Sequence, residues 1–97
     1  MTLNRNERSK IDLTTFSLSI SSAAFMGLGL VPVHEGSPPQ VDLERARQNI
    51  DLLELIYDKT KGNRTPEEEQ LISQLLFEMR MKFIEKQKEN DSTFQAI

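Results

Sequence analysis

The 97-residue sequence contains no cysteine and no tryptophan, and it has a single histidine. The absence of cysteine excludes disulfide bonds and cysteine-ligated metal centres. One histidine is too few for the paired Glu-x-x-His motifs of di-metal helical bundles. The sequence also lacks a glycine-rich phosphate loop and a nucleophile elbow. We therefore expect no catalytic, cofactor-binding or metal-binding residues, and we expect that the protein is not an enzyme.

An excess of basic charge is also missing, since the formal net charge is −3. This balance argues against nucleic acid as a partner, because a broad basic face is the usual footprint of such binding. The length corresponds to one domain with a small hydrophobic core. Small domains without disulfides or metals are often stabilised by oligomerisation. The composition therefore favours a partner that is a second copy of the chain.

A helical hairpin is the clearest pattern in the sequence. The first arm is expected over residues 42–61, with Asp42 as its N-cap and Gly62 as the left-handed residue that ends it. Its apolar residues recur three and four positions apart, as on one face of a helix: Leu43, Ala46, Ile50, Leu53 and Tyr57.

The second arm is expected over residues 65–88 and opens with a capping box. Thr65 is the N-cap, Pro66 fills the first helical position, and Glu68 is placed to accept from the Thr65 amide. The apolar face follows at helical spacing: Ile72, Leu75, Leu76, Met79 and Phe83.

Residues 13–33 carry no charge and include six hydroxyl side chains. Such a stretch is long enough to cross a bilayer, so a membrane-associated protein anchored by residues 13–33 stays an alternative. The hydroxyl groups, two glycines and Pro32 disfavour it. We prefer a buried helix over residues 13–28, in which Ser17, Ser21 and Ala24 form a narrow strip where another backbone can approach closely.

A helix that is apolar on most sides must be covered on most sides. Since the hairpin covers one flank of the first helix, we expect a second copy of the chain to cover the other. The candidate interface residues are Phe16, Ile20, Phe25 and Leu28. The helical domain is expected to span residues 13–89, between a flexible N-terminus (1–12) and a flexible tail (90–97).

Three charged residues form a candidate ion-pair cluster. Arg47 and Asp51 are four residues apart beside the apolar stripe of the first arm, and Arg80 of the second arm is expected to approach them. Glu54 and Asp58 are interpreted as part of a solvated acidic face. His34 lies in a proline-containing connector and is interpreted as an exposed loop residue.

Three runs of the sequence resemble a bacterial family catalogued as domain of unknown function 1844. They are FSLSISSAAFMGLG (16–29), VDLERARQNIDLLELI (41–56) and KTKGNRTPEEEQLISQLLFEMRMKF (59–83). The resemblance covers about residues 16–85 and implies a small cytoplasmic bacterial protein, with no activity, cofactor or functional residue to carry over. The family usually carries a leucine in place of Arg64, which we interpret as a residue of an exposed turn.

The sequence thus predicts an all-α fold in which an apolar first helix packs on an antiparallel helical hairpin. The favoured function is a non-catalytic, homo-oligomeric interaction or scaffold module that binds itself or an unidentified protein. Two alternatives to this function stay open. One is the membrane-associated protein described above, and the other is a small-molecule binding module with an apolar pocket between the helices.

Overall fold

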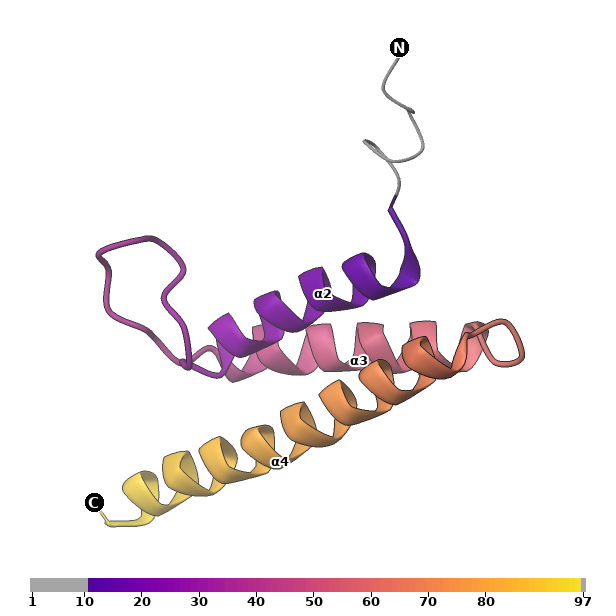
Figure 1. Ribbon diagram of the computed structural model, residues 1–97. Helices are drawn as coiled ribbons and strands as arrows, with labels where there is room; N and C mark the ends of the chain where they lie inside the picture. Colours follow the sequence, from indigo (N-terminus) through magenta and orange to yellow (C-terminus); the bar gives the residue numbers. More distant parts are fainter. Residues whose placement is uncertain (1–10, 97) are drawn as a thin grey trace.

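The computed structural model describes residues 11–96, with side chains to residue 91. This part of the chain forms three helices and no strand: α2 (Leu13–Gly27), α3 (Leu43–Lys59) and α4 (Pro66–Ala96) (Figure 1). The prediction of an all-α, three-helix fold is confirmed. Most of the predicted flexible N-terminus, residues 1–10, lies outside the described residues.

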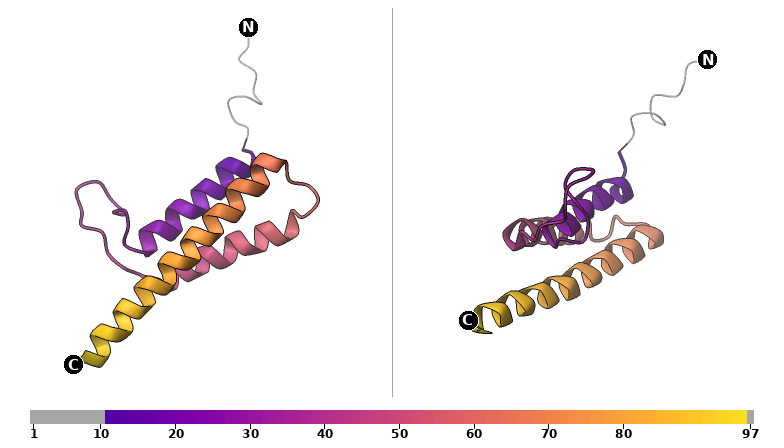
Figure 2. Two further views of the ribbon diagram at one scale, coloured as in Figure 1. Left: turned by 60° about the horizontal axis from the view of Figure 1, so that its bottom comes forward. Right: turned by 90° about the vertical axis from the view of Figure 1, so that its left-hand side faces the viewer.

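The helices form two layers. α2 and α3 lie side by side in one layer, and α4 runs across them in the other (Figure 2). Each helix contacts both of the others. The hydrophobic core fills the space between the layers: Ile20, Ala24, Ile50, Leu53, Ile72, Leu76 and Met79.

Each of the three helices begins with a side-chain cap. The Asp42 carboxylate accepts a hydrogen bond of 3.1 Å from the Arg45 amide, as predicted. Asp12 caps α2 in the same way, accepting from the Thr15 amide at 2.8 Å. This second cap was not predicted, because Asp12 was grouped with the flexible N-terminus.

The predicted capping box of α4 is formed in full. The Thr65 amide donates to Glu68 Oε1 at 2.8 Å, and the Glu68 amide donates to Thr65 Oγ1 at 3.1 Å. Helix α3 ends at Lys59, two residues before the predicted end, and Gly62 lies in the turn that follows, where its φ of 85° is in the left-handed region as predicted. The local sequence therefore determines both ends of the α3–α4 turn.

Thr65→Ala is expected to lower the free energy of unfolding by about 1 kcal/mol, the usual cost of a lost N-cap. Urea denaturation measures the change. Thr65→Ser, which keeps the hydroxyl, is the matched control and should retain most of the stability. Equal stability of the alanine variant and wild type would contradict a role for this cap.

Helix α4 continues to Ala96, so the predicted helix end near residue 88 is too early. The apolar pattern stops after Ile84, but neither glycine nor proline follows to break the helix. Two ion pairs, Lys82–Glu85 and Lys86–Glu89, each at 3.7 Å, lie along this solvated part. With 31 residues α4 is about 46 Å long, against about 25 Å for the 17 residues of α3. Its C-terminal part therefore projects beyond the other helices (Figure 1).

Small side chains bring α2 and α3 close together. Ser17, Ser21 and Ala24 are buried, which agrees with the predicted strip, and Gly27 continues it. The Asp42 amide donates to the Gly27 carbonyl at 2.7 Å. The chain thus leaves α2, makes its long connection and returns to the same point to begin α3.

Candidate interaction surface

The structure divides the four candidate interface residues into two groups. Ile20 is 6% exposed and Leu28 is fully buried, so the chain itself covers both. Phe25 is half-buried and packs against the core, whereas Phe16 is 44% exposed. The expectation that a second copy of the chain covers Ile20 and Leu28 is therefore wrong. Ile20 belongs to the core between the two layers, whereas Leu28 follows the end of α2 and pairs with Val41 in an isolated bridge just before α3.

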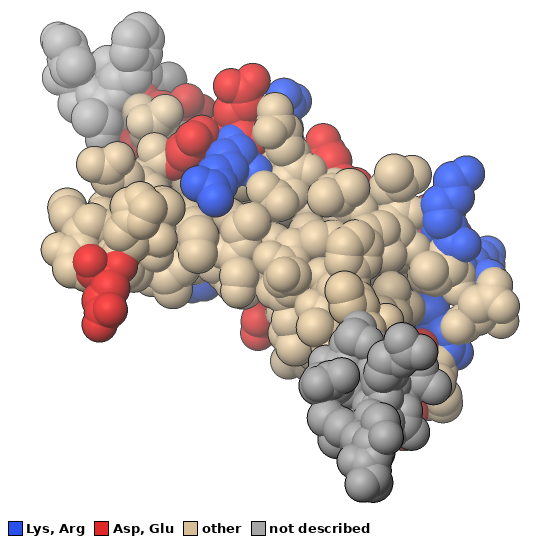
Figure 3. Space-filling model, turned by 90° about the horizontal axis from the view of Figure 1, so that it is seen from above, with Lys and Arg blue, Asp and Glu red and all other residues tan. Residues whose placement is uncertain are grey.

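The part of α2 that neither α3 nor α4 covers is an uncharged face. The helix has no charged residue, and it exposes Leu18 (46%) as well as Phe16. Three small hydroxyl residues, Thr15, Ser19 and Ser22, are exposed along the same helix. Seen from above α2, uncharged atoms occupy the middle of the surface and charged side chains lie toward its margins (Figure 3). We call this surface the α2 face, defined by Phe16, Leu18, Ser19 and Ser22.

The predicted cluster of Arg47, Asp51 and Arg80 is not brought together as an ion-pair network in the described part of the chain. Arg80 instead pairs with Glu54 of α3, with a hydrogen bond of 2.7 Å from Nε to Oε2. Both side chains are substantially exposed, so the pair contributes at most about 1 kcal/mol. Arg47 and Asp51 are exposed on α3. The Arg80–Glu54 pair marks the seam between α3 and α4.

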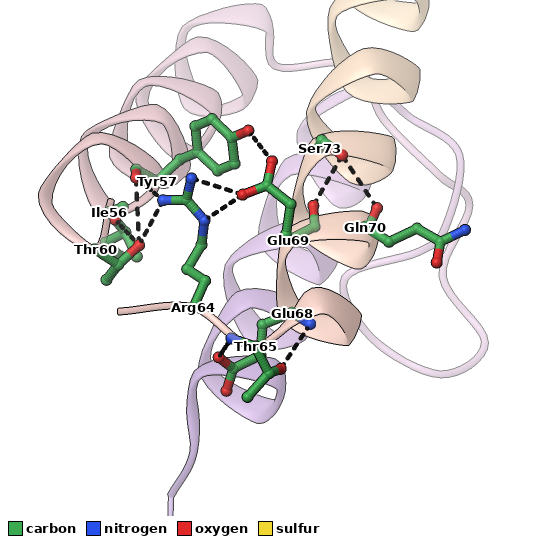
Figure 4. A network of polar contacts seen from close by, with 9 residues as sticks. All are labelled: Ile56, Tyr57, Thr60, Arg64, Thr65, Glu68, Glu69, Gln70 and Ser73. Atoms are coloured by element: carbon green, nitrogen blue, oxygen red, sulfur yellow. Dashed lines mark hydrogen bonds and ion pairs between the residues drawn. The ribbon is translucent and has the colours of Figure 1, made fainter. Parts of the chain in front are cut away.

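A denser polar network surrounds Arg64 at the α3–α4 turn (Figure 4). Its guanidinium lies 3.9 Å from the centroid of the Tyr57 ring and forms a salt bridge of 2.7 Å with Glu69. It also donates to the Tyr57 carbonyl oxygen and, at 3.1 Å, to Thr60 Oγ1. The Tyr57 hydroxyl donates to the second carboxylate oxygen of Glu69. Arg64 thus joins the end of α3 to the start of α4.

These contacts change the acidity of two groups in the network. The hydrogen bond from Tyr57, followed by that from Arg64, lowers the pKa of Glu69. The same bond to Glu69, together with desolvation, raises the pKa of Tyr57. Both pKa shifts report the same favoured pair, in which the neutral Tyr57 phenol donates to the charged Glu69 carboxylate. The network therefore holds the turn in place.

Arg64 was interpreted as exposed, but its side chain is only 9% exposed. A residue that lies between a glycine and a proline in a turn, as Arg64 does, is expected to be exposed to solvent. Here a long side chain folds back over α3, which sequence spacing alone does not reveal. The available signal was an aromatic residue and an acid on either side of the turn, Tyr57 and Glu69, both able to bind a guanidinium.

The connector contains a hollow of about 320 Å³ lined by Val33, His34, Ser37, Pro38 and Gln40. It lies within the loop, whereas the small-molecule alternative required a pocket between the helices. Ser37 Oγ donates to the His34 carbonyl oxygen at 2.7 Å and accepts from the His34 amide at 3.3 Å. These bonds close a local turn. They occupy the polar groups of Ser37 and of the His34 main chain, so few polar groups of the loop point into the hollow.

Residues 11–96 contain neither a membrane-spanning helix nor a cluster of metal ligands. None of the helices there is long and apolar enough to cross a membrane. With its 15 residues, α2 is about 22 Å long, against roughly 30 Å for a hydrocarbon core. No group of three or more histidine, aspartate or glutamate side chains in that range is arranged to hold a metal ion.

Comparison with known proteins gives one match. Neither a curated protein nor a solved structure matches the chain. One family model matches residues 10–85, which include α2, α3, the turn held by Arg64 and most of the apolar face of α4. The chain therefore belongs to the family described as Domain of unknown function (DUF1844).

Proposed function

We propose that this protein is a non-catalytic interaction module that assembles with copies of itself through the α2 face. The observation that carries the proposal is the uncharged helix α2, which leaves Phe16 and Leu18 nearly half-exposed after α3 and α4 have packed. Phe16 and Leu18 are two positions apart and so lie on opposite flanks of the exposed half of the helix, and apolar side chains left on such an uncharged surface are typical of protein interfaces. The narrow hydroxyl residues between them permit close approach of a second helix.

The chemistry of the α2 face supports a second copy as its occupant. Without charges, the face offers no electrostatic recognition to nucleic acid or to a strongly charged peptide. Pairing of identical uncharged faces also avoids the like-charge contacts that a chain of net charge −3 would otherwise meet. A two-fold contact of this kind is the commonest form of homo-oligomer.

Phe16→Asp and Leu18→Asp are each expected to lower the oligomeric mass measured by light scattering after gel filtration. The introduced carboxylate would be desolvated at the interface yet solvated in a single copy, because both positions are exposed there. Circular dichroism should show an unchanged helix content. The effect on assembly should be at least tenfold in the dissociation constant, equivalent to about 1.4 kcal/mol.

Leu55→Asp is the matched control. Leu55 is 52% exposed, and it follows Ala46 by nine residues, or half a turn beyond two full turns. It therefore lies on the side of α3 away from α2. This variant should keep the wild-type mass. A monomeric wild type, or assembly that Leu55→Asp disrupts while Leu18→Asp does not, would overturn the proposal.

A further inference from the structure

A second apolar stripe lies on α4, on the side away from the core. Phe77 is 64% exposed, and Met81 and Ile84 are each 45% exposed. Their spacing of four and then three residues places them on one line along the helix. The buried residues Leu76 and Met79 of the same helix point elsewhere, into the core. We call these three residues the α4 stripe.

The spacing of the α4 stripe is that of a two-stranded coiled coil. Phe77 and Ile84 occupy equivalent d positions of a heptad, and Met81 occupies the a position between them. The neighbouring a positions are Gln74 and Lys88. Because these are polar, the apolar seam is about two helical turns long. A helix of the same kind is the shape that fits such a seam.

The charges beside the stripe select the direction of the partner helix. Arg80 occupies a g position and Glu85 an e position, where residues of paired helices meet across the seam. In a parallel pair, Arg80 of one copy faces Glu85 of the other. In an antiparallel pair, e positions meet e positions and g positions meet g positions, so Glu85 would face another glutamate and Arg80 would face Arg80 or Gln87. Opposite charges therefore meet only in the parallel arrangement.

The side chains required for this contact are accessible. Arg80 is 52% exposed although it pairs with Glu54, and Glu85 is 55% exposed beside Lys82. The guanidinium has enough donors to bind two carboxylates at once. A parallel partner would therefore add to the Arg80–Glu54 pair at the α3–α4 seam without breaking it.

We propose that two copies of this chain pair in parallel through the α4 stripe, forming a contact separate from the α2 face. The stripe contributes three apolar side chains, so the contact is small and its formation depends on protein concentration. A chain with two separate self-association surfaces builds assemblies larger than a dimer. This inference goes beyond the proposed function and does not depend on the α2 face.

Cysteine crosslinking tests the pairing directly, because the natural chain has no cysteine. Met81→Cys and Ile84→Cys are prepared separately, each with and without Leu18→Asp, and oxidised under identical mild conditions. Parallel pairing places each new cysteine beside its copy, so both variants should form disulfide-linked dimers. Glu89→Cys is the control: it lies outside the seam, its side chain is 67% exposed, and it should crosslink far more slowly.

The two proposals fail in different ways. Crosslinking through 81 and 84 that persists in the Leu18→Asp background supports the α4 contact, whatever the fate of the α2 face. Crosslinking of Met81→Cys alone would indicate antiparallel pairing and overturn the proposal. Rates no higher than those of Glu89→Cys would overturn it as well, and they would leave the α2 face unaffected.

Charge reversal provides a measurement that introduces no cysteine. Glu85→Arg places two like charges across the seam and should raise the concentration for half-pairing about tenfold in sedimentation experiments on the Leu18→Asp background. Glu89→Arg makes the same change in charge outside the seam and should have little effect. Equal effects of the two substitutions would contradict the parallel arrangement.

Discussion

Gly27→Ala is expected to lower the free energy of unfolding by about 2 kcal/mol, as in other overpacked interiors. On an exposed helix the same change would be stabilising by up to about 1 kcal/mol, because alanine is the better helix former. At Gly27, however, a new Cβ would lie 2.7 Å from the Ala46 nitrogen and 2.9 Å from the Asp42 oxygen. Both obstructing atoms belong to the main chain where α3 begins, so neither can rotate away as a side chain would.

Urea denaturation at a fixed protein concentration measures this change, since self-association also affects stability. Gln48→Ala is the control, because Gln48 is exposed on α3 and belongs to neither of the two association surfaces. It should change stability by about 0.5 kcal/mol or less. If Gly27→Ala proved as stable as wild type, the close approach of α2 to α3 would be refuted.

Arg64→Ala is expected to cost about 2 kcal/mol of stability through the lost cation–π contact and the lost hydrogen bonds of a nearly buried guanidinium. The Tyr57 carbonyl and Thr60 hydroxyl would lose their shared donor. Because the network joins α3 to α4, we expect a lower urea midpoint for the whole domain.

Two companion substitutions separate charge from packing at Arg64. Lys61→Ala removes an exposed cation from the same turn and should cost about 0.5 kcal/mol or less. Arg64→Leu removes the charge but keeps an apolar side chain, and it should recover part of the loss by packing on Tyr57. Equal stabilities of Arg64→Ala and Lys61→Ala would contradict the role of the network.

The pH dependence of stability should report the Tyr57–Glu69 hydrogen bond. Because the folded pKa of Glu69 is lowered, its stabilising effect is present above its ordinary pKa of 4.5 and is lost as the pH falls through the lowered value. Because the pKa of Tyr57 is raised, its effect is present below 10.0 and is lost as the pH rises through the raised value. The midpoint temperature of thermal denaturation should therefore fall more steeply toward both low and high pH for wild type than for Glu69→Gln.

Elements with strong local signals were predictable. The Asp42 cap, the Thr65–Glu68 capping box and the left-handed Gly62 all appear where the sequence placed them. Each depends on atoms within a few residues along the chain, so no tertiary contact is needed to determine it. The end of α4 was harder to place, because no residue there stops the helix and its apolar pattern fades gradually.

The candidate interface was predictable only in part. The sequence correctly indicated an apolar first helix, yet Ile20 and Leu28 proved buried within the chain while Phe77 proved exposed. Periodicity shows which residues share a face, but it does not show which face a third helix covers. The crossing of α4 beneath α2 and α3 decides that, and it leaves the α2 face and the α4 stripe in solvent.

The sequence by itself therefore determined the fold class, the helix starts and the close-approach strip of α2. These follow from hydrogen bonds and side-chain volumes that are local to one segment. Only the tertiary structure decided that Arg64 joins α3 to α4, that Arg80 meets Glu54, and which apolar residues stay uncovered. Those outcomes depend on the relative placement of helices, which is set by the packing of the whole core.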